Sequence, residues 1–325
     1  MVRTYLDEVP WGDDEFLRQE EEKTRKERKK LPVGCQDSTL YKDIMRIAWP
    51  SLVELFLASL ASMVDMIMVG QINESYFNCI SDNAVAAVNL AAQPKFIFVS
   101  LIIALNTGIT AAVARARGAG DHEKANETLR QGLLFSFGVS VFGSVAGFVF
   151  AEPLVAFMAN GGLSEATMAM GVDYLRIQML GFLTMGISST YTAALRGTGN
   201  SKLPMTYNII ANVFNVFGNY VLINGNPAWG VVGASLATVL GQGIAMAIAI
   251  QRCGTGKYYF TVHITDFVRD FKPDLEIMGR IVKVGIPSLG EQLIMRLGVI
   301  LFTRQVAGLG DEAYTTHQIC MNIQS

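Results

Sequence analysis

Residues 44–69 constrain the fold of this chain most, because they join a long apolar segment to two acidic side chains. About 20 apolar residues, rising about 1.5 Å each along a helix, cross the ~30 Å hydrocarbon core of a bilayer. Glu54 and Asp65 each cost roughly 2.5 to 3.5 kcal/mol near the bilayer centre. They lie about three helical turns apart and share one face, which we expect to contact other helices or water.

The composition of the whole chain favours a membrane protein. Of its 325 residues, 51% are hydrophobic and 17% are charged, whereas about a quarter of residues are charged in soluble domains. A net charge of -2 gives no basic footprint for nucleic acid. The scattered cysteines and histidines offer no disulfide framework or zinc site, and no nucleophile pair or phosphate loop indicates an enzyme or a bound cofactor. We therefore expect an all-α, polytopic membrane protein that is not an enzyme.

Seven apolar stretches are long enough to cross a membrane, and links rich in glycine and asparagine separate several of them. The stretches cover residues 44–69, 84–113, 131–158, 171–195, 203–223, 230–251 and 281–307. An eighth begins near Ala313, and the sequence reaches Ser325 before this stretch could cross.

Positive charge is distributed unevenly among the links, which predicts the orientation of the chain. Of the 26 Lys and Arg residues, 22 lie in the N-terminal region or in alternate links, whereas the links at 70–83, 159–170 and 224–229 contain none. Because cytosolic loops are enriched in Lys and Arg, we expect a cytoplasmic N-terminus and a place in the cell membrane. Residues 1–43 would form a charged cytosolic tail, either a solvated extension or a segment that binds anionic lipid.

A short motif recurs in the first and seventh stretches. Pro50, Ser51, Leu52 and Glu54 are matched by Pro287, Ser288, Leu289 and Glu291 at a constant offset of 237 positions. Because both stretches are expected to start on the cytosolic side, the match predicts a parallel duplication with six helices in each half. We expect a first six-helix lobe at 44–251, a cytosolic linker at 252–280 and an incomplete second lobe at 281–325.

Polar residues form a stripe on the fifth stretch and a shorter stripe on the sixth. Asn208, Asn212, Asn215 and Asn219 follow the spacing of a single helical face, and Ser235, Thr238 and Gln242 do so on the sixth stretch. Carboxamides within hydrocarbon need hydrogen-bond partners. The stripes therefore predict either bonds between helices or a hydrated pocket centred on Asp65.

Several short motifs occur in a characteristic order along the chain. They are Val64–Gly70, Ala84–Ala91, Ala114–Asp121, Leu195–Gly199 followed by Pro204, and Gly230–Thr238. Their order and spacing resemble those of the multidrug and toxic compound extrusion (MATE) transporters. The resemblance covers nearly everything from about residue 44 onward.

The resemblance implies an antiporter of two six-helix lobes that exports drugs or metabolites in exchange for H+ or Na+. It implies that Asp65 holds the coupling ion, surrounded by Asn215, Asn219 and Thr238, and that any metal ion is a Na+ at Asp65. Certain proton-coupled members have aspartate where this chain has Asn219, so coupling by a pair of aspartates is not supported. The alternative role of Asp65 is structural, as a carboxylate bonded to the amides of the fifth helix.

Other polar residues within the stretches are candidates for the substrate cleft. Glu291 matches an acid that some family members carry in the seventh helix, whereas Glu54 matches no known family role. Glu291 could instead pair with Arg296, and Lys95 and Arg296 fit a structural ion pair as well as a place in the cleft. The complete set of cleft candidates is Glu54, Lys95, Asn208, Asn212, Glu291 and Arg296.

We therefore expect a cation-coupled antiporter that exports small organic cations by alternating access, contacts membrane lipid and works as a monomer at full length. A lipid-linked oligosaccharide flippase of the same superfamily is the alternative, and it would need a larger and more basic cleft. A non-transporting membrane scaffold is a third interpretation, which inward-facing stripes of acids and amides fit poorly. Since members of the family have twelve helices, we expect this chain to be a fragment that does not transport by itself.

Overall fold

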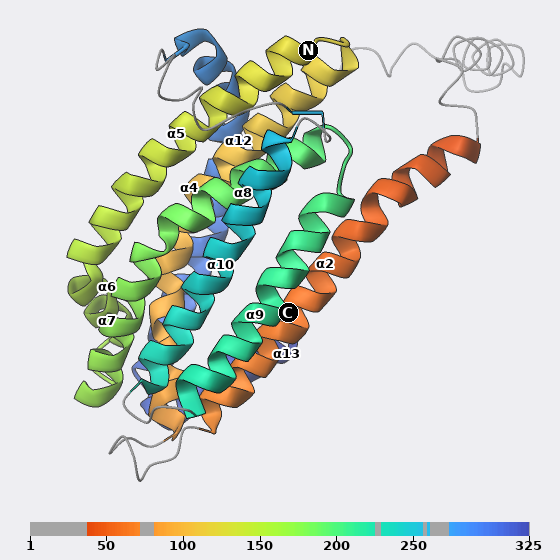
Figure 1. The fold of residues 1–325 in the computed structure, drawn as a ribbon. Coiled ribbons are helices and arrows are strands. Elements are labelled where there is room, and N and C mark those ends of the chain that lie inside the picture. Colours follow the sequence, from red (N-terminus) through yellow and green to blue (C-terminus); the bar gives the residue numbers. More distant parts are fainter. Residues whose placement is uncertain (1–37, 72–80, 225–228, 256–258, 261–272, 325) are drawn as a thin grey trace, which may run out of the picture. The chain divides into compact units, whose positions relative to one another are not determined.

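The computed structural model describes residues 38–71, 81–224, 229–255, 259–260 and 273–324, and its regular elements are all α-helices (Figure 1). The helices are α2 (Ser38–Gly70), α4 (Ser81–Gly118), α5 (His122–Val149), α6 (Ala151–Ala159), α7 (Glu165–Leu180), α8 (Phe182–Gly197), α9 (Lys202–Asn224), α10 (Gly230–Gly254), α12 (Leu275–Ala307) and α13 (Asp311–Gln324). The chain forms two units, Met1–Trp49 and Pro50–Ser325, and the boundary between them falls inside α2.

The predicted all-α membrane protein is confirmed. Among the described residues, five helices are long and apolar enough to cross a membrane, namely α4, α5, α10 and α12 over most or all of their lengths and α2 from Ala48 to Gly70. The helix α9 is also long enough, at 23 residues, but it is not among these five, and asparagines recur along it. Its polar stripe is therefore a real departure from a plain spanning helix.

Two of the predicted spans are each split into a pair of helices, which is a correction to the sequence analysis. The stretch at 131–158 breaks at Phe150, between α5 and α6. Pro153 has no N–H to donate to the carbonyl of Val149, so an uninterrupted helix would lose a hydrogen bond there. The stretch at 171–195 breaks at Gly181, between α7 and α8, where a side-chain Cβ would overlap the side chain of Val239.

The helices α2 and α12 repeat one pattern over their whole length. Each has 33 residues and one internal proline, Pro50 or Pro287, and both ends of α12 lie 237 positions after the corresponding ends of α2. The sequence match seen in a few residues thus extends to the helix boundaries, as the predicted duplication requires. The lobe boundaries themselves stay a prediction, and residues 1–37 of the predicted tail and most of the predicted linker lie outside the described residues.

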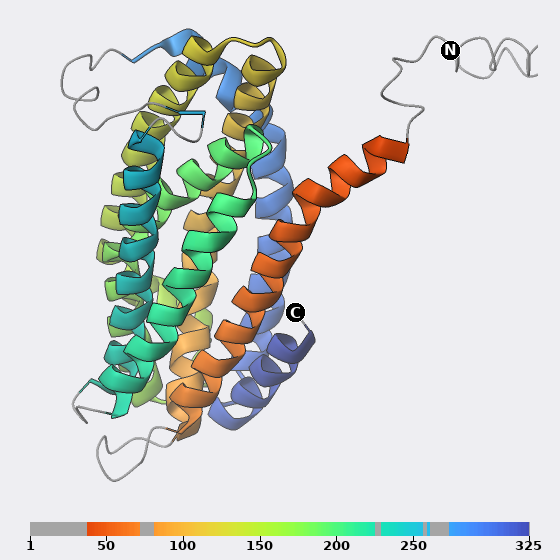
Figure 2. The same cartoon turned by 45° about the vertical axis from the view of Figure 1, so that its right-hand side comes forward.

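Within the unit Pro50–Ser325, α4 is the central helix. It packs against α5, α6, α7, α8, α12 and α13. Small residues at its start, including Ala84, Ala86, Ala87 and Ala91, are completely buried and allow neighbouring helices to approach closely. The helix α9 packs on α10, and Figures 1 and 2 show α2 running along the other side of α9.

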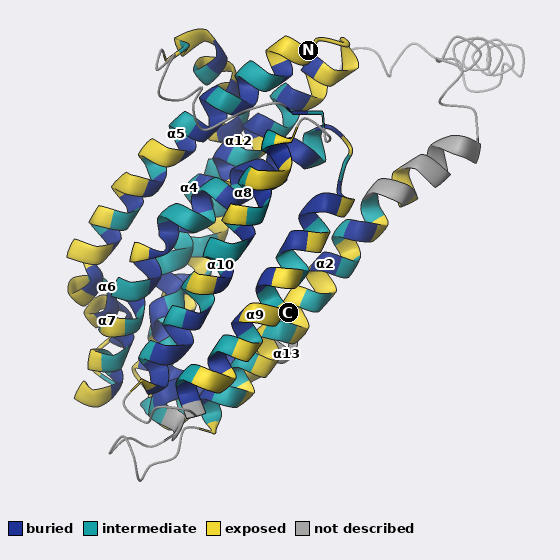
Figure 3. Cartoon of the chain, in the orientation of Figure 1, coloured by how far each residue is buried: buried dark blue, intermediate teal, exposed yellow. Residues whose placement is uncertain are grey.

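Exposed and buried positions alternate along the helices of this unit (Figure 3), and many of the exposed residues are large and apolar. On α9, Val213 and Phe217 are 63% and 64% exposed, while Asn215 and Asn219 are 7% and 1% exposed. An extensive exposed apolar surface of this kind suits contact with lipid. The amides of α9 therefore point toward the other helices, and the apolar face of α9 points outward.

Candidate functional site

A cavity of about 470 Å³ lies between α2, α8, α9 and α10. Glu54 and Asp65 both line it from α2, separated by the small residues Ala58, Ala61 and Ser62. Its other polar lining residues are Ser188, Ser189, Thr192, Arg196, Asn208, Asn212, Asn215, Thr238 and Gln242. The polar stripes predicted on three helices thus meet in one space.

Asp65 is held by carboxamides at one end of this cavity. The amide of Asn219 donates a hydrogen bond of 2.6 Å to Asp65 Oδ1. The amide of Asn215 lies between Asp65 and Thr238. In the orientation that satisfies both of its polar atoms, its nitrogen is 2.9 and 3.1 Å from the carboxylate oxygens and its oxygen is 3.1 Å from Thr238 Oγ1. Asp65, Asn215, Asn219 and Thr238 are therefore joined by a chain of hydrogen bonds.

Glu54 has a different environment at the other end of the cavity. Its Oε1 accepts hydrogen bonds from Arg196 Nη2 at 2.9 Å and from Asn208 Nδ2 at 2.7 Å. Glu54 is 8% exposed, and its Oε2 has no hydrogen-bond partner among the described residues. The carboxylate is thus an ion-paired anchor between α2, α8 and α9.

The two acids differ in the charge of their partners. Glu54 contacts a guanidinium, which offsets its charge. The hydrogen-bond donors described for Asp65 are neutral amides, which orient a carboxylate without neutralising it. An ionised carboxylate is costly in a low-dielectric interior unless a counter-charge or proton compensates it. Asp65 is therefore the acid of this cavity that still requires a cation or a proton.

Three of the predicted cleft candidates lie elsewhere. Lys95 Nζ donates a 3.0 Å hydrogen bond to Gln178 Oε1 on α7, and the guanidinium of Arg296 lies 4.2 Å from the ring centroid of Phe96. Glu291 is exposed. None of these candidates is among the residues that line the cavity of Glu54 and Asp65. Asn208 and Asn212 do line it, as does Glu54.

The sequence analysis missed the wall that α8 contributes. The charge pattern places Arg196 in a link between helices, but it lies in the last turn of α8 and pairs with Glu54. Ser188, Thr192 and Arg196 follow one another at intervals of four residues, which is the spacing of one helical face. This four-residue spacing of polar side chains could have indicated that α8 lines the cavity. The glycines that follow Arg196 conceal the spacing, because they make the region resemble a link between helices.

Comparisons with known proteins agree with this architecture. The family model described as MatE matches residues 50–221. The chain is 27% identical over 293 residues to the probable multidrug resistance protein NorM of Thermotoga maritima, covering 87% of the chain and 58% of that protein. It is 28% identical over 285 residues to the uncharacterized transporter YisQ of Bacillus subtilis, covering 86% of the chain and 59% of that protein.

A solved structure of a MOP superfamily transporter from Pyrococcus furiosus has the same fold. It aligns with a TM-score of 0.73 and 23% sequence identity, over 87% of this chain and 60% of that one. The predicted fold, a MATE-like helical membrane protein, is thereby confirmed. The chain spans about three fifths of the length of the relatives it matches.

Proposed function

The chain belongs to the MatE family, and from this premise we propose that it forms the ion-coupling part of an antiporter that exports small organic cations. One observation carries the proposal: Asp65 faces the cavity with neutral amide partners, whereas Glu54 in the same cavity already has Arg196 as a counter-ion. A carboxylate in that position is the group whose charge changes when it exchanges H+ or Na+.

The surroundings of Asp65 also suit a bound Na+. Hard cations take oxygen ligands, and the carboxylate of Asp65 and the hydroxyl of Thr238 are oxygens of this kind. Asn219 Oδ1 is buried and has no hydrogen-bond partner among the described residues. Because such an atom normally has a partner, it supports a site for an ion or a water beside Asp65. Whether H+ or Na+ occupies it depends on their competition for the carboxylate.

The packing of α2 supports a mechanism of alternating access. Only 11% of its apolar core segment is buried, against 44% for α4. Between Pro50 and Gly70, hydrogen bonds and an ion pair attach α2 to its neighbours at Glu54 and Asp65. Neutralising Asp65 would weaken its contact with α9, and α2, of which little is buried, would then shift. Exchange of the ion is thereby linked to a change in the shape of the cavity.

The charge of the cavity supports an organic cation as the exported molecule. Two acids and one guanidinium line the cavity, so it is acidic rather than basic. The flippase alternative calls for a more basic cleft, and the basic cleft candidates Lys95 and Arg296 do not line this cavity. The proposal includes the predicted cell-membrane location, cytoplasmic N-terminus and monomeric full-length state.

Two measurements with Asp65→Asn test the proposal. Efflux of a fluorescent organic cation from cells that express the full-length protein should fall to background, while the amount of protein in the membrane is unchanged. Adding Na+ to the purified chain in weakly buffered detergent should release protons from the unsubstituted chain and none from the variant. Asp173→Asn, at an exposed acid of α7, is the matched control and should behave like the unsubstituted protein. Unchanged efflux and unchanged proton release in Asp65→Asn would contradict the assignment.

A further inference from the structure

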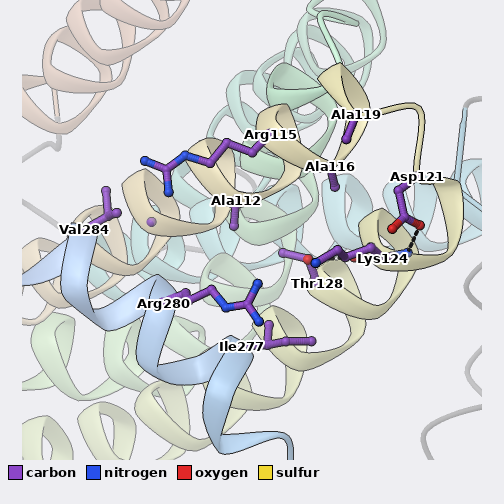
Figure 4. A pocket seen from close by; sticks show the side chains of 11 residues that line it. Ala112, Arg115, Ala116, Ala119, Asp121, Lys124, Thr128, Ile277, Arg280 and Val284 are labelled. Carbon is purple, nitrogen blue, oxygen red and sulfur yellow. Dashed lines mark hydrogen bonds between the residues drawn. The ribbon is translucent and has the colours of Figure 1, made fainter.

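A second cavity, of about 210 Å³, lies where the end of α4 meets the beginnings of α5 and α12 (Figure 4). Three cations from three different helices line it: Arg115 from α4, Lys124 from α5 and Arg280 from α12. This cavity is separate from the one that contains Asp65, and neither the proposed ion exchange nor the proposed export uses it.

The acids near this cavity are already engaged. Asp121 lines it, but its Oδ1 accepts a 2.9 Å hydrogen bond from the backbone N–H of Lys124 and so caps α5. Glu276 pairs with Arg280 one turn away on α12, outside the lining. The lining itself contains three cations and one acid. Like charges held around a small space repel one another, and an anion bound between them would relieve that repulsion.

Close packing of two helices fixes this arrangement. Gly108 of α4 lies against the backbone carbonyl of Ile281 in α12, and any side chain at position 108 would overlap that carbonyl. Arg115 and Arg280 extend from this tightly packed pair of helices on either side of the small residues Ala112 and Ala116. The cations are therefore brought together by the fold and not by a flexible loop.

A separate, apolar cavity is lined by the same three helices. Its volume is about 310 Å³, and all of its lining residues are apolar or glycine, among them Leu105 of α4, Val139 and Phe142 of α5, and Ile286 and Leu289 of α12. At about 1.5 Å per residue, Ile286 lies about 9 Å along α12 from Arg280, Leu105 about 15 Å along α4 from Arg115, and Val139 about 23 Å along α5 from Lys124. The first two distances fall within the depth of one leaflet, about half of the ~30 Å hydrocarbon core.

We propose that the face formed by α4, α5 and α12, with its basic and its apolar cavity, binds one anionic glycerophospholipid. Its phosphate lies among Arg115, Lys124 and Arg280, and one acyl chain occupies the apolar cavity. A basic pocket at the membrane interface matches an anionic headgroup, and the apolar cavity on the same three helices distinguishes a lipid from a soluble phosphate. The lipid would bridge the first repeat, through α4 and α5, to α12 of the second.

The experiment compares lipids of equal chain length on the purified chain by native mass spectrometry. Phosphatidylglycerol should remain bound as a single molecule at detergent concentrations that remove phosphatidylcholine. The double variant Arg115→Gln/Arg280→Gln should weaken its retention about 25-fold, since each removed cation is worth about fivefold. The control Arg117→Gln/Arg130→Gln removes two cations of α4 and α5 that do not line the cavity, and retention should be unchanged.

Further measurements distinguish a lipid headgroup from free phosphate and control for misfolding of the variants. Arg115→Lys/Arg280→Lys keeps both charges and should retain most of the binding. Inorganic phosphate and dihexanoyl phosphatidylglycerol should compete weakly with the long-chain lipid, because they leave the apolar cavity empty. Equal retention of the two long-chain lipids, equal loss in both double glutamine variants, or full displacement by inorganic phosphate would each overturn the proposal.

Discussion

The helices α2 and α12 share a length, a proline and a glutamate, but different forces hold them in place. Each has only 11% of its apolar core segment buried. Polar side chains attach α2, through Glu54 to Arg196 and through Asp65 to Asn219. Backbone packing attaches α12 to α4, where Gly108 and Gly285 let the two helices touch.

The repeat positions show how this difference arises. The position 237 residues after Asp65 is Phe302, which is 59% exposed and contacts the ring of His317. The position 237 residues before Gly285 is Ala48. At the first position α2 has the acid Asp65 where α12 has the apolar Phe302. At the second position α2 has the methyl group of Ala48 where α12 has Gly285, which allows the backbone contact with α4. We infer that duplicated helices diverged into one that responds to an ion and one that packs rigidly against the centre of the bundle.

Removing the counter-ion of Glu54 should have the largest effect on stability. Arg196→Leu leaves a buried carboxylate without its cation, and breaking a buried pair in this way costs about 3 kcal/mol. The loss of stability should be smaller than for a fully buried pair, because the side chain of Arg196 is 38% exposed. Chemical unfolding in detergent micelles, followed by tryptophan fluorescence, measures the change.

The double variant Glu54→Leu/Arg196→Leu separates loss of the pair from loss of packing. It removes both charges, so most of the stability should return. A double variant as unstable as Arg196→Leu alone would show that the ion pair does not attach α2 in the way we describe.

The difference between local patterns and contacts between distant residues explains what could be predicted from the sequence. The stripe of α9 is local, so its period alone is enough to place Asn215 and Asn219 on one face. The pairing of Glu54 with Arg196 joins residues 142 positions apart, and no local pattern encodes it. The breaks at Phe150 and Gly181 are hidden because apolar residues continue on both sides of each. Glu291 matches Glu54 in sequence, but partners supplied by α8 and α9 make Glu54 buried.

A smaller effect should follow from crowding the contact of α12 with α4. A Cβ at position 285 would lie 2.8 Å from the carbonyl oxygen of Ala104, so Gly285→Ala forces the helices apart and should cost about 2 kcal/mol. Gly298→Ala, on the same helix, meets no atom within 4 Å and should stabilise the chain by about 0.5 to 1 kcal/mol. Thermal unfolding of the two variants side by side checks both signs. Equal shifts would mean that close backbone packing does not hold α12.

The smallest effect is expected at the glutamate of the second repeat. Glu291 is exposed, and surface substitutions of this kind usually change the free energy of unfolding by less than about 0.5 kcal/mol. Glu291→Gln should therefore leave stability unchanged, whereas Glu54→Gln weakens the bond to Arg196 and should cost about 1 to 3 kcal/mol. The two substitutions are chemically identical and lie at the same repeat position, so only the surroundings of the carboxylate differ. A loss in Glu291→Gln as large as in Glu54→Gln would mean that the repeated glutamate acts through its own helix and not through partners on α8 and α9.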